Sequence, residues 1–374
     1  MKIGFDAKRA FNNRTGLGNY GRFVLNALAQ YGYLQELFLY TPKISAELAT
    51  ANAALSGFAR LPPSAFQTKL HPLWRSFWVV NQLQKEGIDV FHGLSNELPV
   101  GLKKTNIKSV VTIHDLIFER YPELFSRIDR FIYHQKFKTA CRQADKIVAV
   151  SQQTKRDIVT FYGIEQSRIE VVYQDCDAVF KTRVLVEKLE EVAQKYGLQT
   201  PYLLSVGSIE TRKNQLRLVQ AFREADLPNA QLVLVGKATH YQRQIEDYIQ
   251  RYQLGGSVKI LNQVPFVDLP ALYQAATAAV YISLFEGFGI PVVEALHSGV
   301  PVLAASGSCL EEAGGGGALY ANPLDVSDIA NNLKIIWQHH PTRQRLITDG
   351  QQHVAQFAAP HVAAQLVRLY ESLG

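Results

Sequence analysis

The segment Ser283–Pro301 carries two glutamates in a setting that suits the binding of hydroxyl or phosphate groups. It reads S-L-F-E-G-F-G-I-P-V-V-E-A-L-H-S-G-V-P, with Glu286 in a glycine-rich loop and Glu294 about one turn into the helix that follows. The loop can offer the backbone N–H groups of Gly287–Gly289 to a hydroxyl or phosphate, with a carboxylate on either side. Two carboxylates also suit a glycosidase acid and nucleophile, but a loop followed by a helix does not turn them toward each other.

Two adjacent cations form a second candidate site. Arg212 and Lys213 follow a strand and a glycine turn, and they enter a helix at Asn214. Cations at a helix N-terminus oppose the helix dipole, so structure alone gives no reason for the pair. An anion bound between these side chains and the free backbone amides removes the conflict, and a solvated pair of charges is the alternative.

The run Gly16-Leu17-Gly18-Asn19-Tyr20-Gly21 matches the G-x-G-x-x-G pattern of dinucleotide-binding domains. In such domains the glycines follow the first strand directly, whereas ten residues, Asp6–Thr15, intervene here. The second strand also ends without a carboxylate to hold a ribose. NAD binding is therefore not expected. A glycine loop opening onto a helix can still present amides to a phosphate or a sugar.

Two further groups have competing interpretations. Asp175-Cys176-Asp177 resembles a D-x-D metal motif, but it has no carboxylate cluster beside it, so turn chemistry is expected and no metal is assigned. His114 and Asp115 close a strand, where a histidine is either a capping or core residue or part of a site.

Composition and charge narrow the class of protein. The chain has 374 residues, 47% apolar and 19% charged, which excludes a disordered or fibrous protein and favours two to three domains. No secretion signal or membrane-spanning stretch is visible, so a cytoplasmic protein is expected. Residues 1–190 carry 26 Lys and Arg against 18 Asp and Glu, so this half is suited to an anionic partner. Phosphorylated substrates, acidic lipid and nucleic acid all fit this charge.

Short apolar runs alternate with amphipathic stretches, which predicts βαβ units and parallel sheets. Expected strands include 2–5, 37–40, 90–92, 109–113, 202–207, 231–236 and 279–282, and expected helices include 21–31, 127–144 and 361–372. The alternation breaks near residue 180 and restarts. The sequence therefore predicts two doubly wound domains, with ligands bound beyond the carboxyl ends of the strands in the cleft between them. The glycine run Gly314–Gly317 is expected to be a flexible loop.

These residues resemble family 4 of the glycosyltransferases, the retaining nucleotide-sugar enzymes of the GT-B fold, over nearly the whole chain. The motifs that carry the resemblance are Gly16–Gly18, Thr112–Asp115, Ala144–Ser151, Arg212–Asn214 and the E-x7-E pair Glu286 and Glu294 within G-F-G-I-P. The resemblance implies domains at 1–178 for the acceptor and 179–357 for the nucleotide sugar. The last helix, within 358–374, is implied to return to the first domain.

The resemblance also implies a role for each matched residue. Glu286 is implied to hold the hydroxyls of the donor sugar, Glu294 the ribose, and Arg212 with Lys213 the diphosphate leaving group. The backbone carbonyl of His114 is implied to support the oxocarbenium ion. Further donor contacts are implied at Gly16, Gly18, Ser208, Val264, Gly287, Phe288, Gly289 and Ile290. Ser208 departs from the family, because many members have an arginine there, so either Arg212 substitutes for it or the diphosphate binds more weakly.

The sequence is thus expected to encode a metal-independent retaining hexosyltransferase of cell-envelope polysaccharide synthesis, without cofactor. GDP-mannose is favoured as donor over a UDP-hexose, because the segment Ser208–Asn214 resembles mannosyltransferase members. The expected acceptor is a glycan or a lipid-linked glycan, with peripheral contact between the first domain and an anionic membrane and with no nucleic acid. A glycoside hydrolase and a non-catalytic nucleotide-sugar binder are the alternatives from other classes.

Overall fold

The computed structural model describes residues 1–13, 15–33, 37–46, 48, 53–70 and 73–374, which form two compact units. Unit 1 comprises Met1–Gln174 and Phe357–Gly374, and unit 2 comprises Asp175–Gln356. The sequence places the first boundary at 178/179 instead. The chain joins unit 2 already at Asp175, because the Asp175 carboxylate is held there by Lys181 and by Nε2 of His297 at 2.8 Å.

The sheet of unit 1 is parallel throughout its described strands, in the order β3-β2-β1-β4-β5-β6-β7. These strands are β1 (Ile3–Asp6), β2 (Leu37–Tyr40), β3 (Ala59–Arg60), β4 (Val90–Gly93), β5 (Lys108–Ile113), β6 (Lys146–Ala149) and β7 (Ile169–Val171). The described α-helices of this unit are α1 (Lys8–Asn12), α2 (Gly16–Leu28), α4 (Ala53–Ser56), α5 (Ala65–Lys69), α7 (Val79–Glu86), α8 (Ile117–Arg120), α9 (Arg127–Gln143), α10 (Gln152–Tyr162) and α19 (Ala359–Glu371).

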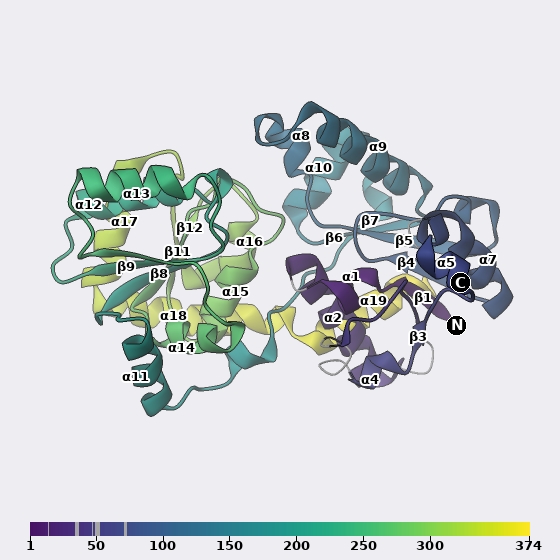
Figure 1. Cartoon of the computed structure of the whole chain (residues 1–374), viewed down its shortest axis with the longest axis horizontal. Helices are drawn as coiled ribbons and strands as arrows, with labels where there is room; N and C mark the ends of the chain where they lie inside the picture. The colour runs from purple at the N-terminus through teal and green to yellow at the C-terminus, as the bar shows by residue number, and fades with distance from the viewer. Residues whose placement is uncertain (14, 34–36, 47, 49–52, 71–72) are drawn as a thin grey trace. The chain divides into compact units, whose positions relative to one another are not determined.

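Unit 2 contains a second parallel sheet, in the order β10-β9-β8-β11-β12-β13. Its strands are β8 (Tyr202–Val206), β9 (Gln231–Val235), β10 (Val258–Leu261), β11 (Ala278–Tyr281), β12 (Val302–Ala305) and β13 (Ala318–Ala321). Its α-helices are α11 (Val186–Lys195), α12 (Gln215–Ala225), α13 (Gln242–Arg251), α14 (Leu269–Ala275), α15 (Ile290–His297), α16 (Leu310–Gly314), α17 (Val326–Gln338) and α18 (His340–Val354). Helices α12 and α17 lie side by side over this sheet (Figure 1).

The predicted α/β architecture with two doubly wound sheets is confirmed. Strands such as β9, in which all five residues are buried, have helices over both faces and read in the sequence as continuous apolar runs. None of the described helices combines the length and the apolar character that crossing a membrane requires.

Two expectations about glycines are wrong. Helix α2 begins at Gly16, so Gly16–Gly18 form its first turn and not a loop before it. A Cβ atom on Gly18 would lie 1.9 Å from the carbonyl oxygen of Asn13, so this glycine allows the chain leaving α1 to pass close to α2. The run Gly314–Gly317 ends α16 and forms a 3-10 turn that packs against α18.

Helix α19 belongs to unit 1 and packs against α2 (Figure 1). A buried polar chain ties it to the sheet. The Tyr370 hydroxyl lies 2.7 Å from Nδ1 of His92, whose Nε2 lies 2.8 Å from the hydroxyl of Thr112. That hydroxyl lies 3.1 Å from the hydroxyl of Tyr20 on α2. Burial lowers the pKa of His92 to about 3, so the ring is neutral at physiological pH.

Candidate active site

The loop between β11 and α15 positions Glu286 and Glu294. Helix α15 begins at Ile290 with Pro291 in its first turn, a position where proline costs no hydrogen bond. Gly289, at the N-cap, has φ of +129°, and a Cβ atom there would lie 2.8 Å from Leu310 of α16. Because glycine allows both the conformation and the close packing, Glu286 stays in the loop while Glu294 is carried into the helix.

Glu286 is the centre of a buried charged cluster. Its Oε1 lies 2.6 Å from Nζ of Lys213, and its Oε2 lies 2.6 Å from Nη1 of Arg212. The Tyr281 hydroxyl donates to Oε1 at 3.2 Å and also accepts a hydrogen bond from Lys213. Burial alone raises the pKa of Glu286, but the charges of Lys213 and Arg212 outweigh it and hold this pKa at about 2. The carboxylate is therefore ionised over the whole physiological range.

The backbone around the two cations is fixed by contacts between two loops. Arg212 and Lys213 lie in a 3-10 turn, and Asn214 follows with a left-handed φ of +63° before α12 begins. The Asn214 side chain donates to the carbonyl of Ile282 at 3.2 Å, and Arg212 donates to the carbonyl of Phe285 at 2.8 Å. Since β8 and β11 are paired neighbours, their loops meet at one sheet edge and bring the cations onto Glu286.

Arg212 has a second acidic partner, because its Nη2 donates to Glu210 at 2.7 Å. Carboxylates thus compensate the two charges at the start of α12, where the sequence alone indicates a bound anion.

Glu294 has different partners from Glu286. The Tyr273 hydroxyl donates to its Oε2 at 3.1 Å and also contacts the carbonyl of Pro291. Burial raises the pKa of Glu294 to about 7, an effect that the nearby Asp177 reinforces. This carboxyl therefore changes charge near neutral pH.

The other expected donor residues lie in the same part of unit 2. Phe288 and Gly289 are buried, whereas Gly287 and Ile290 are partly exposed in the loop and at the start of α15. Ser208 is exposed after β8, and its carbonyl accepts a hydrogen bond from Gln215 at 2.8 Å. Val264 is half-buried in the turn after β10, two strands away from β8 in the sheet.

His114 belongs to unit 1 and lies directly after β5. Its Nε2 donates to the carbonyl of Leu94 at 2.9 Å, and its backbone N–H donates to Oδ1 of Asn96 at 2.9 Å. Its own carbonyl accepts from the Thr154 hydroxyl at 3.3 Å. Burial lowers the pKa of His114 to about 4, so the ring is neutral with its proton on Nε2.

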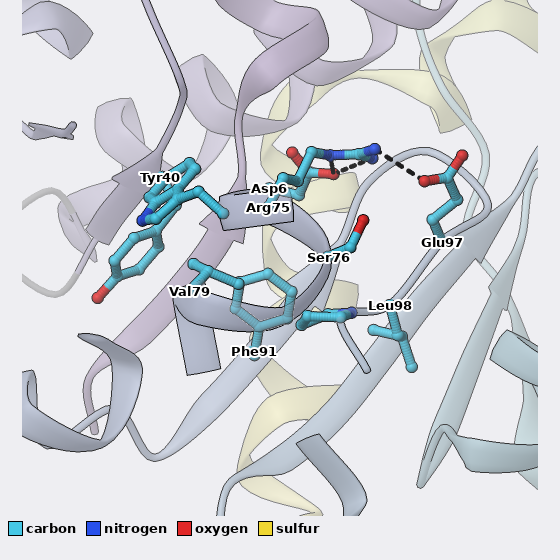
Figure 2. Close-up of a pocket in the computed structure, with 10 residues that line it drawn as sticks. Asp6, Tyr40, Arg75, Ser76, Val79, Phe91, Glu97 and Leu98 are labelled. Carbon is cyan, nitrogen blue, oxygen red and sulfur yellow. Dashed lines mark hydrogen bonds and ion pairs between the residues drawn. The ribbon is translucent and has the colours of Figure 1, made fainter. Parts of the chain in front are cut away.

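A polar cavity lies at the same edge of the unit 1 sheet (Figure 2). Arg75 bridges two carboxylates there, with Nε 2.9 Å from Oδ2 of Asp6 and Nη1 2.7 Å from Oε2 of Glu97. Asp6 ends β1 and Glu97 follows β4, which are neighbouring strands. The cavity wall includes Tyr40 and Trp74, and the buried indole N–H of Trp74 has no hydrogen-bond partner among the described residues.

The D-x-D segment forms a turn, as the sequence indicates. The Asp177 carboxylate accepts from the backbone N–H of Val179 at 3.0 Å and caps a 3-10 helix. Asp175, Cys176 and His297 place potential ligand atoms within 4.8 Å of one another. Both oxygens of Asp175 already have partners, Lys181 and His297, and burial raises the pKa of the Cys176 thiol. This donor set does not fit a metal that has to displace a lysine.

Sequence reasoning missed the two tyrosines of this site, Tyr281 and Tyr273. Tyr281 ends β11, at the edge where parallel strands gather functional side chains, and that position is the signal that could have identified it. Tyr273 lies on α14 and has no comparable signal, because only the tertiary packing brings its hydroxyl to Glu294.

Comparisons with known proteins place this chain among sugar transferases. A model of the "Glycosyltransferase Family 4" matches residues 14–176, and a model of the "Glycosyl transferases group 1" matches residues 188–353. O-antigen chain mannosyltransferase B of Escherichia coli is 29% identical over all of both chains. O-antigen chain mannosyltransferase RfbU of Salmonella typhimurium is 28% identical over 61% of this chain and 60% of that protein.

Solved structures share the fold. Anabaena HepE in complex with UDP and glucose matches with a TM-score of 0.75 and 19% identity, over all of both chains. WaaG, a glycosyltransferase involved in lipopolysaccharide biosynthesis, matches with a TM-score of 0.69 and 16% identity over 98% of this chain and 99% of that chain.

Proposed function

Because the chain belongs to family 4 of the glycosyltransferases, we propose that it transfers mannose from GDP-mannose to a glycan or lipid-linked acceptor, with retention of configuration and without a metal. The observation that carries this proposal is the cluster of Glu286, Arg212 and Lys213 at one sheet edge of unit 2. It combines an ionised carboxylate, which accepts hydrogen bonds from sugar hydroxyls, with two fixed positive charges.

The two cations are proposed to bind the diphosphate. A nucleoside diphosphate carries more negative charge than the single carboxylate that Arg212 and Lys213 hold in the free protein, so it competes for them effectively. Glu286 is then free to accept hydroxyls of the donor sugar. As the glycosidic C1–O bond breaks, negative charge grows on the departing phosphate oxygen, and fixed cations at that position lower the barrier. The same two charges take the part that a divalent cation plays in other transferases.

Retention is proposed to occur by attack on the face that the diphosphate leaves. The acceptor oxygen forms the new bond to C1, and its proton passes to the departing phosphate oxygen. Glu286 is poorly suited to act as a covalent nucleophile, because its pKa of about 2 makes it a weak base and both of its oxygens are engaged by cations. Glu294, as a buried carboxyl, is proposed to bind the ribose hydroxyls.

Unit 1 is proposed to supply the acceptor side of the site. The loop that holds the ring of His114 through Leu94 continues to Glu97, whose carboxylate shares Arg75 with Asp6. Two ionised carboxylates beside a guanidinium offer acceptors and donors for sugar hydroxyls. We propose that these groups bind the terminal sugar of the acceptor beside the carbonyl of His114.

Mannose as the transferred sugar is supported by the O-antigen mannosyltransferases among the relatives, and a UDP-hexose is the alternative that the UDP complexes of HepE favour. A donor panel decides between them. The purified protein is incubated with GDP-mannose, UDP-glucose or UDP-galactose, with and without EDTA, and released nucleotide and free sugar are measured by mass spectrometry. We expect release from GDP-mannose alone, unchanged by EDTA. Release that requires added Mn²⁺ or Mg²⁺ would contradict metal independence.

A glycoside hydrolase is the second candidate, because the pKa values of Glu286 and Glu294 are pushed apart as in an acid and nucleophile pair. The two cations on Glu286 argue against it, since they block the nucleophile. A panel of p-nitrophenyl glycosides tests this directly. Cleavage of any of them without nucleotide would favour the hydrolase over the transferase.

A further inference from the structure

The outward side of helix α9 in unit 1 exposes large apolar side chains that nothing else in this unit covers. Ile128 is 73% exposed, Phe131 66% and Ile132 41%. Since each residue of an α-helix advances by about 100°, these three side chains fall within an arc of about 100°. We call this surface the outer face of α9, consisting of Ile128, Phe131 and Ile132.

The opposite side of α9 anchors the helix to unit 1. Ala140 and Cys141 are buried there, and the ring of Phe137 meets that of Phe118 on α8 with centroids 5.2 Å apart. Tyr133 also packs against Phe118, at 5.7 Å. The helix therefore has its own hydrophobic contact to the fold, and the apolar residues of the outer face are surplus to that contact.

The charge around the outer face is strongly one-sided. Helix α9 contains five Lys and Arg residues and a single acidic residue, Asp129, whose backbone and carboxylate are engaged in the N-cap with Ser126. On the helical projection Lys138 borders the apolar arc on one side and Lys136 borders it on the other. The Lys136 side chain is 54% exposed. Apolar side chains surrounded by cations form the pattern of a helix that lies in the headgroup region of an anionic bilayer.

Other occupants fit this surface less well. A symmetric dimer through the outer face places the same surface of each copy against the other, so the cations around Ile128 and Phe131 would face one another. A nucleic acid would satisfy the charge, but it offers nothing to two isoleucines. An anionic lipid surface satisfies both, because its phosphates bind the cations and its acyl boundary accepts the apolar residues.

We propose that the outer face of α9 docks unit 1 on an anionic membrane surface, with Ile128, Phe131 and Ile132 inserted at the boundary between headgroups and acyl chains. Arg127, Lys136 and Lys138 lie among the lipid phosphates. This contact goes beyond the transfer reaction and involves none of the residues of the proposed donor site.

The test is cosedimentation of the purified full-length protein with large unilamellar vesicles, without nucleotide or acceptor. The vesicles contain either phosphatidylcholine alone or phosphatidylcholine with 30 mol% phosphatidylglycerol, at low and high salt. We expect binding to the anionic vesicles that weakens as salt rises. I128S/F131S should lower the partition coefficient at least tenfold, and R127Q/K138Q should lower it about fivefold for each charge removed.

A matched control uses exposed apolar residues of unit 2. Leu185 and Leu324 are 74% and 66% exposed, so L185S/L324S removes comparable apolar surface without touching α9. This variant should bind vesicles as the wild type does, and thermal melting should show that every variant folds. Hydrolysis of the nucleotide sugar in vesicle-free solution, measured in parallel, should be the same for I128S/F131S and the wild type. Loss of vesicle binding is thereby separated from failure of the transferase proposal.

Three results would overturn the inference. Equal binding to neutral and anionic vesicles would remove the role of the cations. Unchanged binding of I128S/F131S would remove the role of the outer face. A concentration-dependent dimer in light scattering that I128S/F131S abolishes would show that a second copy covers this surface.

Discussion

Replacing Lys213 by methionine tests the donor site most directly. The change removes one of the two charges on Glu286 and keeps most of the side-chain volume. If Lys213 stabilises the charge that develops on the departing diphosphate, its loss should lower kcat by about 10²–10³-fold, equivalent to about 2.7–4 kcal/mol. The nucleotide should also bind more weakly, since one cation fewer meets the diphosphate.

The structure explains why this variant should remain folded. Glu286 keeps Arg212 at 2.6 Å and the hydroxyl of Tyr281 at 3.2 Å. The expected loss is one hydrogen bond between charged groups, about 1.5–3 kcal/mol of the free energy of unfolding. Glu286→Ala is a less clean test, because it leaves Arg212 and Lys213 buried beside each other without their shared carboxylate. Breaking a buried pair in this way costs about 3–5 kcal/mol, so lost activity could reflect unfolding.

The assay compares nucleotide release by the wild type, K213M and K188M, with melting temperatures measured on the same samples. Lys188 is an exposed lysine of α11 in the same unit, so K188M controls for the loss of a positive charge. K188M should match the wild type. Turnover by folded K213M within tenfold of the wild type would refute the assignment of Lys213 to the leaving group.

Three further predictions follow from the described contacts. Because burial raises the pKa of Glu294 to about 7, the nucleotide should bind more tightly as pH rises from 6 to 8 if the ionised carboxylate holds the ribose, and Glu294→Gln should flatten this dependence in a calorimetric titration. Gly18→Ala should lower the free energy of unfolding by about 1–3 kcal/mol through a backbone clash, whereas Gly16→Ala, with no atom within 4 Å of the added Cβ, should not lower it. Tyr370→Phe leaves Nδ1 of buried His92 without its partner and should cost about 1–3 kcal/mol in denaturant unfolding without changing nucleotide affinity; an unchanged midpoint would contradict the buried chain.

The sheets were predictable because parallel strands buried on both faces leave an apolar signature in the sequence. Strands 37–40 and 258–261 coincide with β2 and β10, and most others agree within one or two residues. Strand β13 (Ala318–Ala321) could not be identified in this way. It follows the glycine run Gly314–Gly317, which by local pattern is a loop and which is ordered only by its packing against α18.

The glycine motif near the N-terminus shows the same limit. Gly16, Gly18 and Gly21 match a phosphate-binding pattern, yet the structure gives two of them a packing role. Gly18 allows the close approach of Asn13, and a Cβ on Gly21 would lie 3.3 Å from that of Ala10 in α1. Because α1 and α2 are neighbours in sequence and in space, the same spacing of glycines serves helix packing. Spacing alone cannot separate the two uses.

The site residues were predictable by type, but their partners depend on which strands adjoin. Lys213 and Glu286 are 73 positions apart and meet only because β8 and β11 are neighbours in the sheet. The sequence indicates an anion for the cations and a hydroxyl ligand for the glutamate, as two separate needs. In the folded chain each answers the other: Glu286 is the anion that Arg212 and Lys213 hold.

This mutual neutralisation has a consequence for the donor. A ligand that brings only hydroxyls has to compete with two cations for Glu286, and a ligand that brings only a single negative charge replaces one anion by another. A nucleoside diphosphate sugar brings both groups at once, so it can satisfy Arg212 and Lys213 with phosphate while offering its hydroxyls to the released Glu286. Free diphosphate nucleotide and free hexose should therefore each bind more weakly than the intact donor by more than their separate contacts imply. Equal affinity for GDP and GDP-mannose in a calorimetric titration would show that Glu286 stays with its cations and does not receive the sugar.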